Sequence, residues 1–316
     1  MERRRSTVLV LAVTVCLGTA AAVGWASPTV SASVHATVPA GAAHAAAARV
    51  EADAPRRAAA RPSSERGQDA RDTQGRDALA TQGRDALPTR LDRQQVITSA
   101  ATVTPEAYPN ADVVQVDDLT ICEYRPDGTG VTWSDNYTKV LTEKGRRERQ
   151  GLSFRFLLPY FTVEVSALEL IKPDGSVVPV DIARQSRVMI DRGQMSANIY
   201  DPSSKILQVG VPGVEIGDMV HIVTRQQILR RYMPDTWDDY QVFESTAPIK
   251  HAVYEVHAPQ ERPLVHTVLK DAVDGTVKYE KHERQGRTVH RWEVREVPRF
   301  YAEPGMPPAY TVVQRL

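Results

Sequence analysis

Apolar and polar residues alternate along most of the chain after about residue 105. Within 161–171, for example, Val163, Val165 and Ala167 alternate with polar neighbours. A period of two places successive side chains on opposite faces of a strand. Turn signals separate these runs at strand-like intervals, as in Pro126-Asp127-Gly128, where Pro presets φ and Gly accepts a positive φ. The pattern therefore predicts a series of short strands.

The predicted strands cover most of the C-terminal two thirds of the chain. They are expected at 112–124, 131–141, 161–171, 176–180, 205–211, 218–228, 240–243, 249–257, 264–269, 276–283 and 288–294. Helical patterning is confined to short pieces at 145–150 and 181–185. Many short strands with Gly- and Pro-rich turns favour an all-β fold, a large antiparallel β-sandwich, over residues 105–316.

The region before it has a different composition. Of the 20 aromatic residues in the chain, 19 lie at or after Tyr108, and residues 27–107 contain none. Residues 27–104 are instead rich in Ala, Arg and Pro, and the heptapeptide at 73–79 is repeated at 81–87. A segment that cannot bury apolar surface is typical of a disordered linker, which we expect over 27–104.

Residues 1–26 have the pattern of an export signal. Arginines at positions 3–5 precede an uncharged run from 6 to 26, and small residues stand at positions 24 and 26. This order is typical of a secretory signal peptide. The alternative is an uncleaved anchor, because residues 8–25 are just long enough to span a bilayer. Either interpretation sends the chain to the periplasm or the cell surface, and membrane contact, through residues 8–25, is expected only if this segment is uncleaved.

Charge and cysteine content exclude several functional classes. The 316 residues contain 39 basic and 39 acidic side chains, and residues 105–316 contain 26 and 30, so a nucleic-acid partner is not expected. Two cysteines exclude a disulfide framework, an all-cysteine zinc site and an iron–sulfur cluster. No phosphate-binding loop, dinucleotide fingerprint or Gly-x-Ser-x-Gly motif is present, and we expect no cofactor.

One acidic and aromatic cluster is a candidate ligand-binding site. It combines three carboxylates with two aromatic rings: Asp235, Trp237, Asp238, Asp239 and Tyr240. Carboxylates beside aromatic side chains can bind sugars or a hard cation. An acidic loop that precedes a strand at 240–243 explains the same residues equally well.

Other reactive side chains are better explained by structure than by chemistry. Cys122 lies in the middle of a predicted strand beside an acid that disfavours the thiolate, so it is interpreted as a small core residue rather than a nucleophile. The spacing of His282 and His290 does not match the helical His-Glu-x-x-His zinc motif, and both are expected to be exposed. His251 and His257 could share one strand face, but no third ligand is apparent. No catalytic or metal-binding residue is predicted.

Four motifs in series give the chain a recognisable signature. They occupy 108–112 (Tyr-Pro-Asn-Ala-Asp), 139–145 (Lys-Val-Leu-Thr-Glu-Lys-Gly), 171–180 (Ile-Lys-Pro-Asp-Gly-Ser-Val-Val-Pro-Val) and 211–218 (Val-Pro-Gly-Val-Glu-Ile-Gly-Asp). In this order they resemble the exported bacterial domain of unknown function 3857, over about 105–300. The resemblance implies a β-sandwich like the N-terminal domain of zinc aminopeptidases, usually followed by a transglutaminase-like domain of cysteine-peptidase fold.

The tail at 292–308 resembles the stretch that leads into such a catalytic domain. Because the sequence stops at Leu316, the resemblance carries over no catalytic Cys, His or Asp. The first hypothesis is thus a non-catalytic exported module that scaffolds or assists a transglutaminase-like partner. The alternatives are a stand-alone peptide- or glycan-binding module of the cell envelope, using strand edges or residues 235–240, and a hydrolase using Cys122 or the histidines.

Overall fold

The computed structural model of the protein describes residues 90–197, 200–270, 275–308 and 311–316. The predicted signal at 1–26 and linker residues 27–89 lie outside this range, and so both remain predictions. Among the described residues, no helix combines the length and the apolar character that crossing a bilayer requires.

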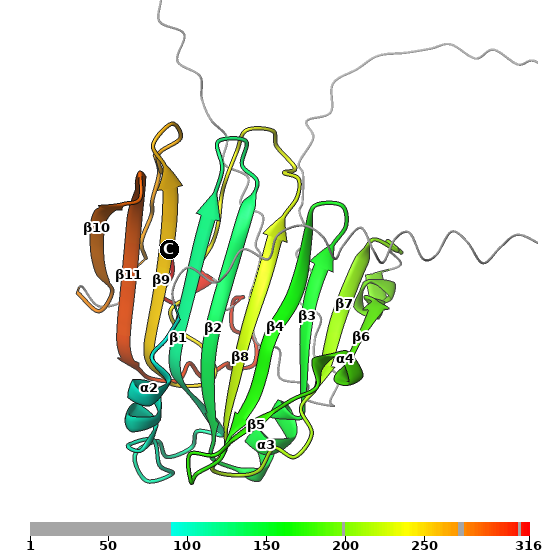
Figure 1. Cartoon of the computed structure of the whole chain (residues 1–316), viewed down its shortest axis with the longest axis vertical. Helices are drawn as coiled ribbons and strands as arrows, with labels where there is room; N and C mark the ends of the chain where they lie inside the picture. The colour runs from blue at the N-terminus through cyan, green and yellow to red at the C-terminus, as the bar shows by residue number, and fades with distance from the viewer. Residues whose placement is uncertain (1–89, 198–199, 271–274, 309–310) are drawn as a thin grey trace, which may run out of the picture. The chain divides into compact units, whose positions relative to one another are not determined.

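Strands dominate the described chain (Figure 1). The elements are α2 (Arg93–Ala100), β1 (Val113–Tyr124), β2 (Gly130–Val140), α3 (Glu143–Arg149), β3 (Gly151–Leu157), β4 (Phe161–Ile171), β5 (Val177–Pro179), α4 (Ile182–Gln185), β6 (Ser186–Ile190), the 3₁₀ helix η1 (Arg192–Ala197), β7 (Ser204–Gly210), β8 (Met219–Ile228), β9 (Ile249–Pro259), β10 (Lys278–Arg284) and β11 (Arg287–Val297).

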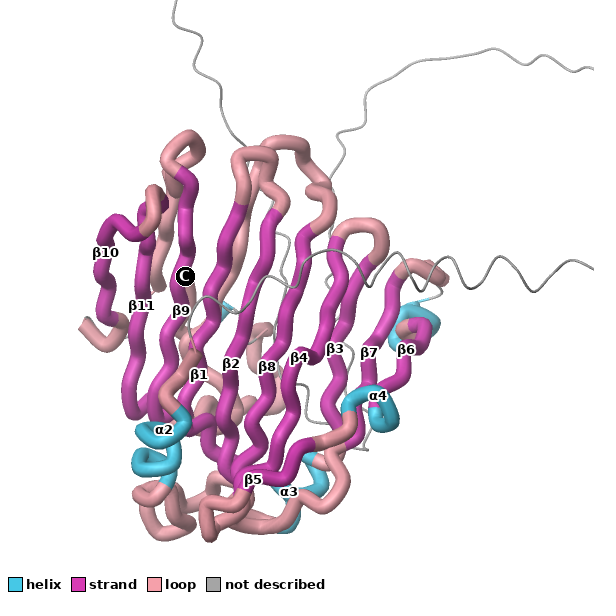
Figure 2. The backbone as a smooth tube through the Cα atoms, in the orientation of Figure 1, coloured by secondary structure: helices cyan, strands magenta, loops and turns pink. Residues whose placement is uncertain are grey.

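These strands form two sheets (Figure 2). An eight-stranded sheet has the order β10-β11-β9-β1-β2-β8-β4-β5, and a three-stranded sheet has the order β3-β7-β6. All pairs are antiparallel except β1 with β9. That pair is parallel because the long irregular connection 229–248 carries the chain from β8 across the sheet before β9 begins. The predicted all-β class is confirmed.

The two sheets share an apolar core. Leu152 of β3 and Leu207 of β7 belong to the same buried cluster as Leu168 and Leu170 of β4. A second cluster, around Trp292, lies where the irregular segments after β8, β9 and β11 pack on the eight-stranded sheet. Burial of these side chains is the main favourable term for folding.

The β1–β2 hairpin is fixed by its turn and by the connection that crosses it. Gly128 has φ +83°, which an L-residue with a side chain rarely adopts. A Cβ atom there would also clash with the carbonyl group of Thr236 in the 229–248 connection. The glycine of the predicted Pro-Asp-Gly turn therefore also allows the 229–248 connection to pass close to the hairpin.

The predicted boundary between linker and folded domain requires correction. Helix α2 lies within 27–104, and Asp92 caps it by accepting hydrogen bonds from the Gln94 and Gln95 backbone. Val96, Ala100 and Val103 of this segment are buried in a cluster with β1 and β2. The average composition of 27–104 did not reveal this helix. Three apolar side chains are enough to dock it, because the sheet supplies the other half of the core. The folded unit therefore begins before residue 105.

The strand predictions failed at four places. Residues 264–269 form no strand and 240–243 make a single bridge, between Val242 and Arg315. Conversely, strands β3 and β6 were not predicted. The short helices α3 and α4 do lie where the sequence indicated them. Residues 264–269 have the alternation of a strand, but Leu264 and Leu269 pack on the Trp292 cluster without a ladder beside them.

Candidate functional site

The predicted ligand-binding cluster lies on the 229–248 connection, and its aromatic rings pack against the rest of the fold. The Trp237 ring stacks on Tyr124 of β1, with ring centroids 4.5 Å apart and an interplanar angle of 10°. The Tyr240 ring lies 5.6 Å from the guanidinium of Arg315 near the C-terminus. The Trp237 ring thus packs the connection against the sheet, and the Tyr240 ring packs it against the C-terminal segment.

The acidic members of the cluster have partners within the chain as well. Asp238 accepts a hydrogen bond from Arg231, and the carbonyl oxygen of Asp235 accepts one from Arg262. Asp235 has φ +53°, in the left-handed region. These contacts shape the connection itself, and ligand binding by residues 235–240 stays a prediction.

Asp239 connects this surface to buried groups beneath it. Its Oδ2 accepts hydrogen bonds from the Tyr254 hydroxyl at 2.7 Å and from the Cys122 thiol at 3.2 Å. Its Oδ1 accepts from the backbone N–H of Tyr240 at 2.8 Å. An exposed carboxylate thus satisfies two buried polar side chains of the eight-stranded sheet.

Cys122 is buried, as the sequence predicted. Its side chain is 1% exposed, and the Thr132 hydroxyl lies 3.3 Å from Sγ on the neighbouring strand. Burial raises the pKa of the thiol well above its usual value, and the nearby Asp239 carboxylate raises it further. The described residues place no imidazole in hydrogen-bond contact with it. A protonated thiol in this position is not an activated nucleophile.

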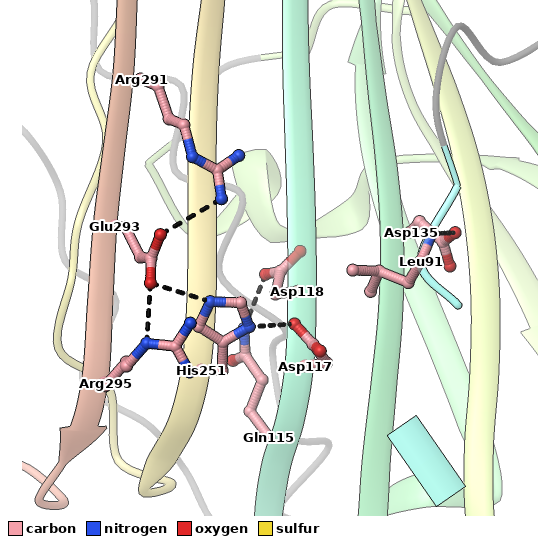
Figure 3. Close-up of polar contacts among 9 residues, drawn as sticks. All are labelled: Leu91, Gln115, Asp117, Asp118, Asp135, His251, Arg291, Glu293 and Arg295. Carbon is pink, nitrogen blue, oxygen red and sulfur yellow. Dashed lines mark hydrogen bonds and ion pairs between the residues drawn. The ribbon is translucent and has the colours of Figure 1, made fainter. Parts of the chain in front are cut away.

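The opposite face of the sheet carries a charged network that the sequence analysis missed (Figure 3). His251 of β9 lies between two strands, with Nδ1 2.7 Å from Asp117 Oδ1 and Nε2 3.5 Å from Glu293 Oε1. Glu293 also accepts hydrogen bonds from Arg295 at 2.7 Å and from Arg291 at 3.2 Å. The network thereby joins β1, β9 and β11.

The same network continues along β9 through a second histidine. Arg291 donates to Glu255 at 2.7 Å, and His257 lies 3.0 Å from Glu255 and 3.2 Å from Glu123. Burial lowers the pKa of His257, but the hydrogen bonds to Glu123 and Glu255 outweigh it and the net shift is upward. His251 and His257 do share one strand face, where each contacts carboxylates.

A third histidine lies deeper in the sheet, between two acids. His221 of β8 is 3% exposed, with Nε2 2.9 Å from Asp135 and Nδ1 2.9 Å from Glu169. Its ring stacks on Tyr137 at a centroid distance of 4.0 Å. Asp135 in turn accepts a hydrogen bond from the backbone N–H of Leu91 at 3.1 Å. The arrangement ties the chain entering α2 to the sheet.

Asp118 lies near Asp117 and Asp135, and the pKa of its carboxyl group is raised. Burial raises the pKa of its carboxyl group to about 7, and the neighbouring Asp117 and Asp135 add to the increase. A hydrogen bond from Asn136 opposes the shift. The Gln115 amide donates to Asp118 at 2.6 Å (Figure 3). This carboxyl group is therefore half-protonated near neutral pH.

No group of three or more His, Cys, Asp or Glu side chains in the described ranges is arranged to hold a metal ion. His282 lies on the exposed strand β10, as expected. His290 was expected to be exposed as well, and this was wrong: it is 7% exposed, and the Tyr279 hydroxyl lies 2.8 Å from its Nδ1.

Together, the fold and these contacts define an all-β, two-sheet module in which Cys122 is buried and His221, His251 and His257 contact carboxylates. Residues 126–301 match the family described as "Domain of Unknown Function with solved-structure structure (DUF3857)". The match covers more than half of the chain, which therefore belongs to this family. No curated protein matches the chain.

The chain was also compared with solved structures. A crystal structure of a "putative protease" from Parabacteroides distasonis ATCC 8503 superposes with a TM-score of 0.56 at 16% identity, over 65% of this chain and 39% of that one. Native yeast LTA4 hydrolase gives a TM-score of 0.29 at 10% identity, over 59% of this chain and 27% of that one. The first of these shows a shared fold, and this chain corresponds to about two fifths of that longer protein.

Proposed function

We propose that this chain is a non-catalytic, exported module of the cell envelope that scaffolds or assists a transglutaminase-like partner domain. The observation that carries the proposal is that Cys122 is buried and that three histidines contact carboxylates. The Cys122 thiol is buried beside a carboxylate, which keeps it protonated. His221, His251 and His257 each lie within ion-pair distance of carboxylates from neighbouring strands.

This arrangement favours a structural role over hydrolysis. A catalytic cysteine needs an imidazole or another base to favour its thiolate. The described part of the chain provides Cys122 with a carboxylate and two hydroxyl groups instead. The histidines are on other parts of the sheet, in charge networks that fix strands to each other.

The comparison with the longer structure supports an accessory role. The shared fold makes up 39% of the protein named as a "putative protease", so most of that chain lies outside the matching region. We infer that a module of this fold accompanies a separate catalytic part. An export signal at 1–26 would bring such a complex to the periplasm or the cell surface, where a transglutaminase-like domain would act on envelope polypeptides.

Photo-crosslinking in the source organism tests this proposal. A photoreactive amino acid would replace an exposed side chain at one of three separated positions in the full chain: Arg295 (60% exposed), Val178 (45%) or Tyr301 (58%). We expect at least one position to capture a polypeptide that contains a Cys-His-Asp transglutaminase-like domain, and the others to capture it weakly.

Two results would contradict the proposal. One is that none of the three positions captures such a polypeptide, while a photoreactive residue at the exposed position of Asp235 captures envelope glycans or unrelated peptides. The other is peptide hydrolysis by the purified full chain that disappears in Cys122→Ser. The first outcome favours a binding module and the second favours an enzyme.

A further inference from the structure

Lys172 and Asp218 form an ion pair at one end of the neighbouring strands β4 and β8 (Figure 1). The last residue of β4, Ile171, lies opposite the first residue of β8, Met219. Lys172 and Asp218 are the next residues outward, and their Nζ and Oδ2 atoms are 2.7 Å apart. The Asp218 side chain is 1% exposed and the Lys172 side chain 23% exposed. The pair therefore brings together the sequence motifs at 171–180 and 211–218 in a largely buried position.

The two carboxylate oxygens of Asp218 differ in their contacts. Oδ2 accepts hydrogen bonds from Lys172 Nζ and, at 2.8 Å, from the backbone N–H of Glu215. Oδ1 is buried and has no hydrogen-bond partner in the described part of the chain. A buried polar atom without a partner is uncommon and costs free energy. The carboxylate is thus held firmly through one oxygen only.

Lys172 has a second acceptor and a neighbouring carboxylate. Its Nζ also donates to the Gly213 carbonyl oxygen at 3.0 Å, and Oε2 of Glu215 lies 3.9 Å from it. Burial opposes the charged forms of an ion pair whose polar atoms are not all satisfied. Transfer of a proton from Nζ to a carboxylate leaves a neutral amine, which is a nucleophile beside a carboxyl group.

We propose that Lys172 and Asp218 condense to an intramolecular isopeptide bond that links β4 to β8 covalently. A bond forms between Nζ and Cγ of Asp218, and the bond between Cγ and Oδ1 breaks. Glu215 carries two protons in turn from Nζ to Oδ1, which leaves as one molecule of water. One ammonium group and one carboxylate are consumed together, so neither an oxidant nor any other reactant is needed. This inference is independent of the proposed function.

The contacts already present fit the product. The amide N–H keeps the hydrogen bond to the Gly213 carbonyl, and the amide oxygen, formerly Oδ2, keeps the one from the Glu215 backbone. The oxygen that leaves is the one without a partner. Condensation therefore removes an unsatisfied buried atom and two largely buried charges. The bond also closes the excursion of the chain that carries β6 and β7, and a cross-link of this kind restricts the unfolded chain as a disulfide does.

A second lysine–aspartate pair shows what distinguishes this one. Lys144 Nζ lies 2.6 Å from Asp112 Oδ2, and Glu148 lies 3.8 Å from the same lysine. The side chains of Lys144 and Asp112 are, however, 59% and 24% exposed. Oδ1 of Asp112 accepts a hydrogen bond from the Thr142 hydroxyl at 2.8 Å. Both charges are solvated and both oxygens have partners, so no condensation is expected there.

Tryptic peptide mapping of the purified full chain, unfolded in urea before digestion and analysed by tandem mass spectrometry, tests the proposal. Lys172 lies in the peptide 156–184 and Asp218 in the peptide 206–225. We expect one linked species whose mass is the sum of the two peptides less one water. The peptides that contain Lys144 and Asp112 are the internal control and should stay unlinked.

Two variants separate the roles of the residues. Lys172→Arg keeps the positive charge beside Asp218 but lacks the amine, and it should abolish the linked species. Glu215→Gln removes the proton carrier and should leave most chains unlinked. Circular dichroism and thermal unfolding of each variant show whether it folds, so that loss of the link is not mistaken for loss of structure.

The proposal is overturned if the two wild-type peptides are recovered entirely unlinked after prolonged incubation of the folded chain. It is also overturned if the linked species persists in Lys172→Arg, since another residue would then form it. An undiminished yield of the link in folded Glu215→Gln would contradict the role assigned to Glu215.

Discussion

The thiol of Cys122 lies 3.2 Å from a carboxylate oxygen of Asp239. This contact joins the centre of the eight-stranded sheet to the irregular connection that carries the predicted ligand-binding residues. It explains two features together. The thiol stays protonated, because burial and a nearby negative charge both disfavour the thiolate. The connection stays on the sheet, because Asp239 is an acceptor for buried donors.

Replacing Asp239 tests its role as the acceptor for two buried donors. Asp239→Ala leaves the Tyr254 hydroxyl and the Cys122 thiol without their acceptor, and we expect a loss in unfolding free energy of about 2 kcal/mol. Asp239→Asn keeps one acceptor oxygen and should lose clearly less. Urea unfolding measures both. Asp238→Ala is the control, and its partly exposed pair with Arg231 should contribute less than about 1 kcal/mol. Equal losses in all three variants would contradict this role.

The raised pKa of Asp118 predicts a pH-dependent stability. The folded-state pKa is about 7 and the usual value is 3.8, so the folded chain binds this proton more tightly than the unfolded chain. The resulting stability is fully present below about pH 4 and is lost as the pH rises through about 7. Asp118→Asn should therefore be more stable than wild type near pH 8, by up to about 4 kcal/mol, and similar near pH 4.

Urea unfolding of wild type and Asp118→Asn at several pH values provides the measurement. Asp117→Asn serves as a comparison, since it removes a neighbouring charge and should lower the pKa of Asp118. A stability difference between Asp118→Asn and wild type that does not change with pH would show that Asp118 keeps an ordinary pKa.

The contacts of Asp135 predict that the sheet holds the N-terminal segment in place. Asp135→Ala removes an acceptor from both the His221 ring and the Leu91 backbone. Leaving buried hydrogen-bond donors without their acceptor costs about 1–3 kcal/mol. Hydrogen exchange should become faster over 91–103 than over β3 or β7. Glu143→Ala, which breaks an exposed pair with Arg146, should leave exchange at 91–103 unchanged. Uniformly faster exchange across the domain would argue against a local tether.

His257 also predicts a pH-dependent stability, but here the cause is its pairing with carboxylates and not its burial. Its folded-state pKa is raised above the usual 6.5, since the hydrogen bonds to Glu123 and Glu255 outweigh burial. The stability from its charge is fully present below the unfolded value and is lost as the pH rises through the folded value. Glu123→Gln should therefore cost more stability near pH 6 than near pH 9. Thermal unfolding of both chains across this range is the measurement, and a constant difference would contradict the assignment.

Local pattern was enough to predict most strands, because alternation and Pro-Asp-Gly turns are encoded over a few residues. Strands β1, β4, β8 and β9 lie where the periodicity placed them. Helix α2 was missed because its stability depends on distant contacts and not on local pattern. Its buried residues Val96 and Ala100 are few, and their contacts are with strands far along the chain. Residues 264–269 show the same limit, since alternation does not reveal whether a neighbouring strand exists.

The candidate site depended even more on pairing between distant strands. The burial of Cys122 could be predicted from its apolar surroundings on one strand. The contacts of His251 could not be predicted in this way. Asp117 is more than a hundred positions away in the sequence, and the contact with Glu293 depends on how β11 aligns with β9. The parallel pairing of β1 with β9 creates this network, and nothing in the local sequence specifies it.

The most direct test of a non-catalytic module is the rate at which a thiol-directed reagent modifies Cys122 in the folded full chain at neutral pH, measured by mass spectrometry of the peptide that contains it. We predict that modification is negligible in the folded chain and becomes rapid only in urea. Fast modification of the folded chain, faster than of the unfolded one, would show an activated thiolate and contradict the account.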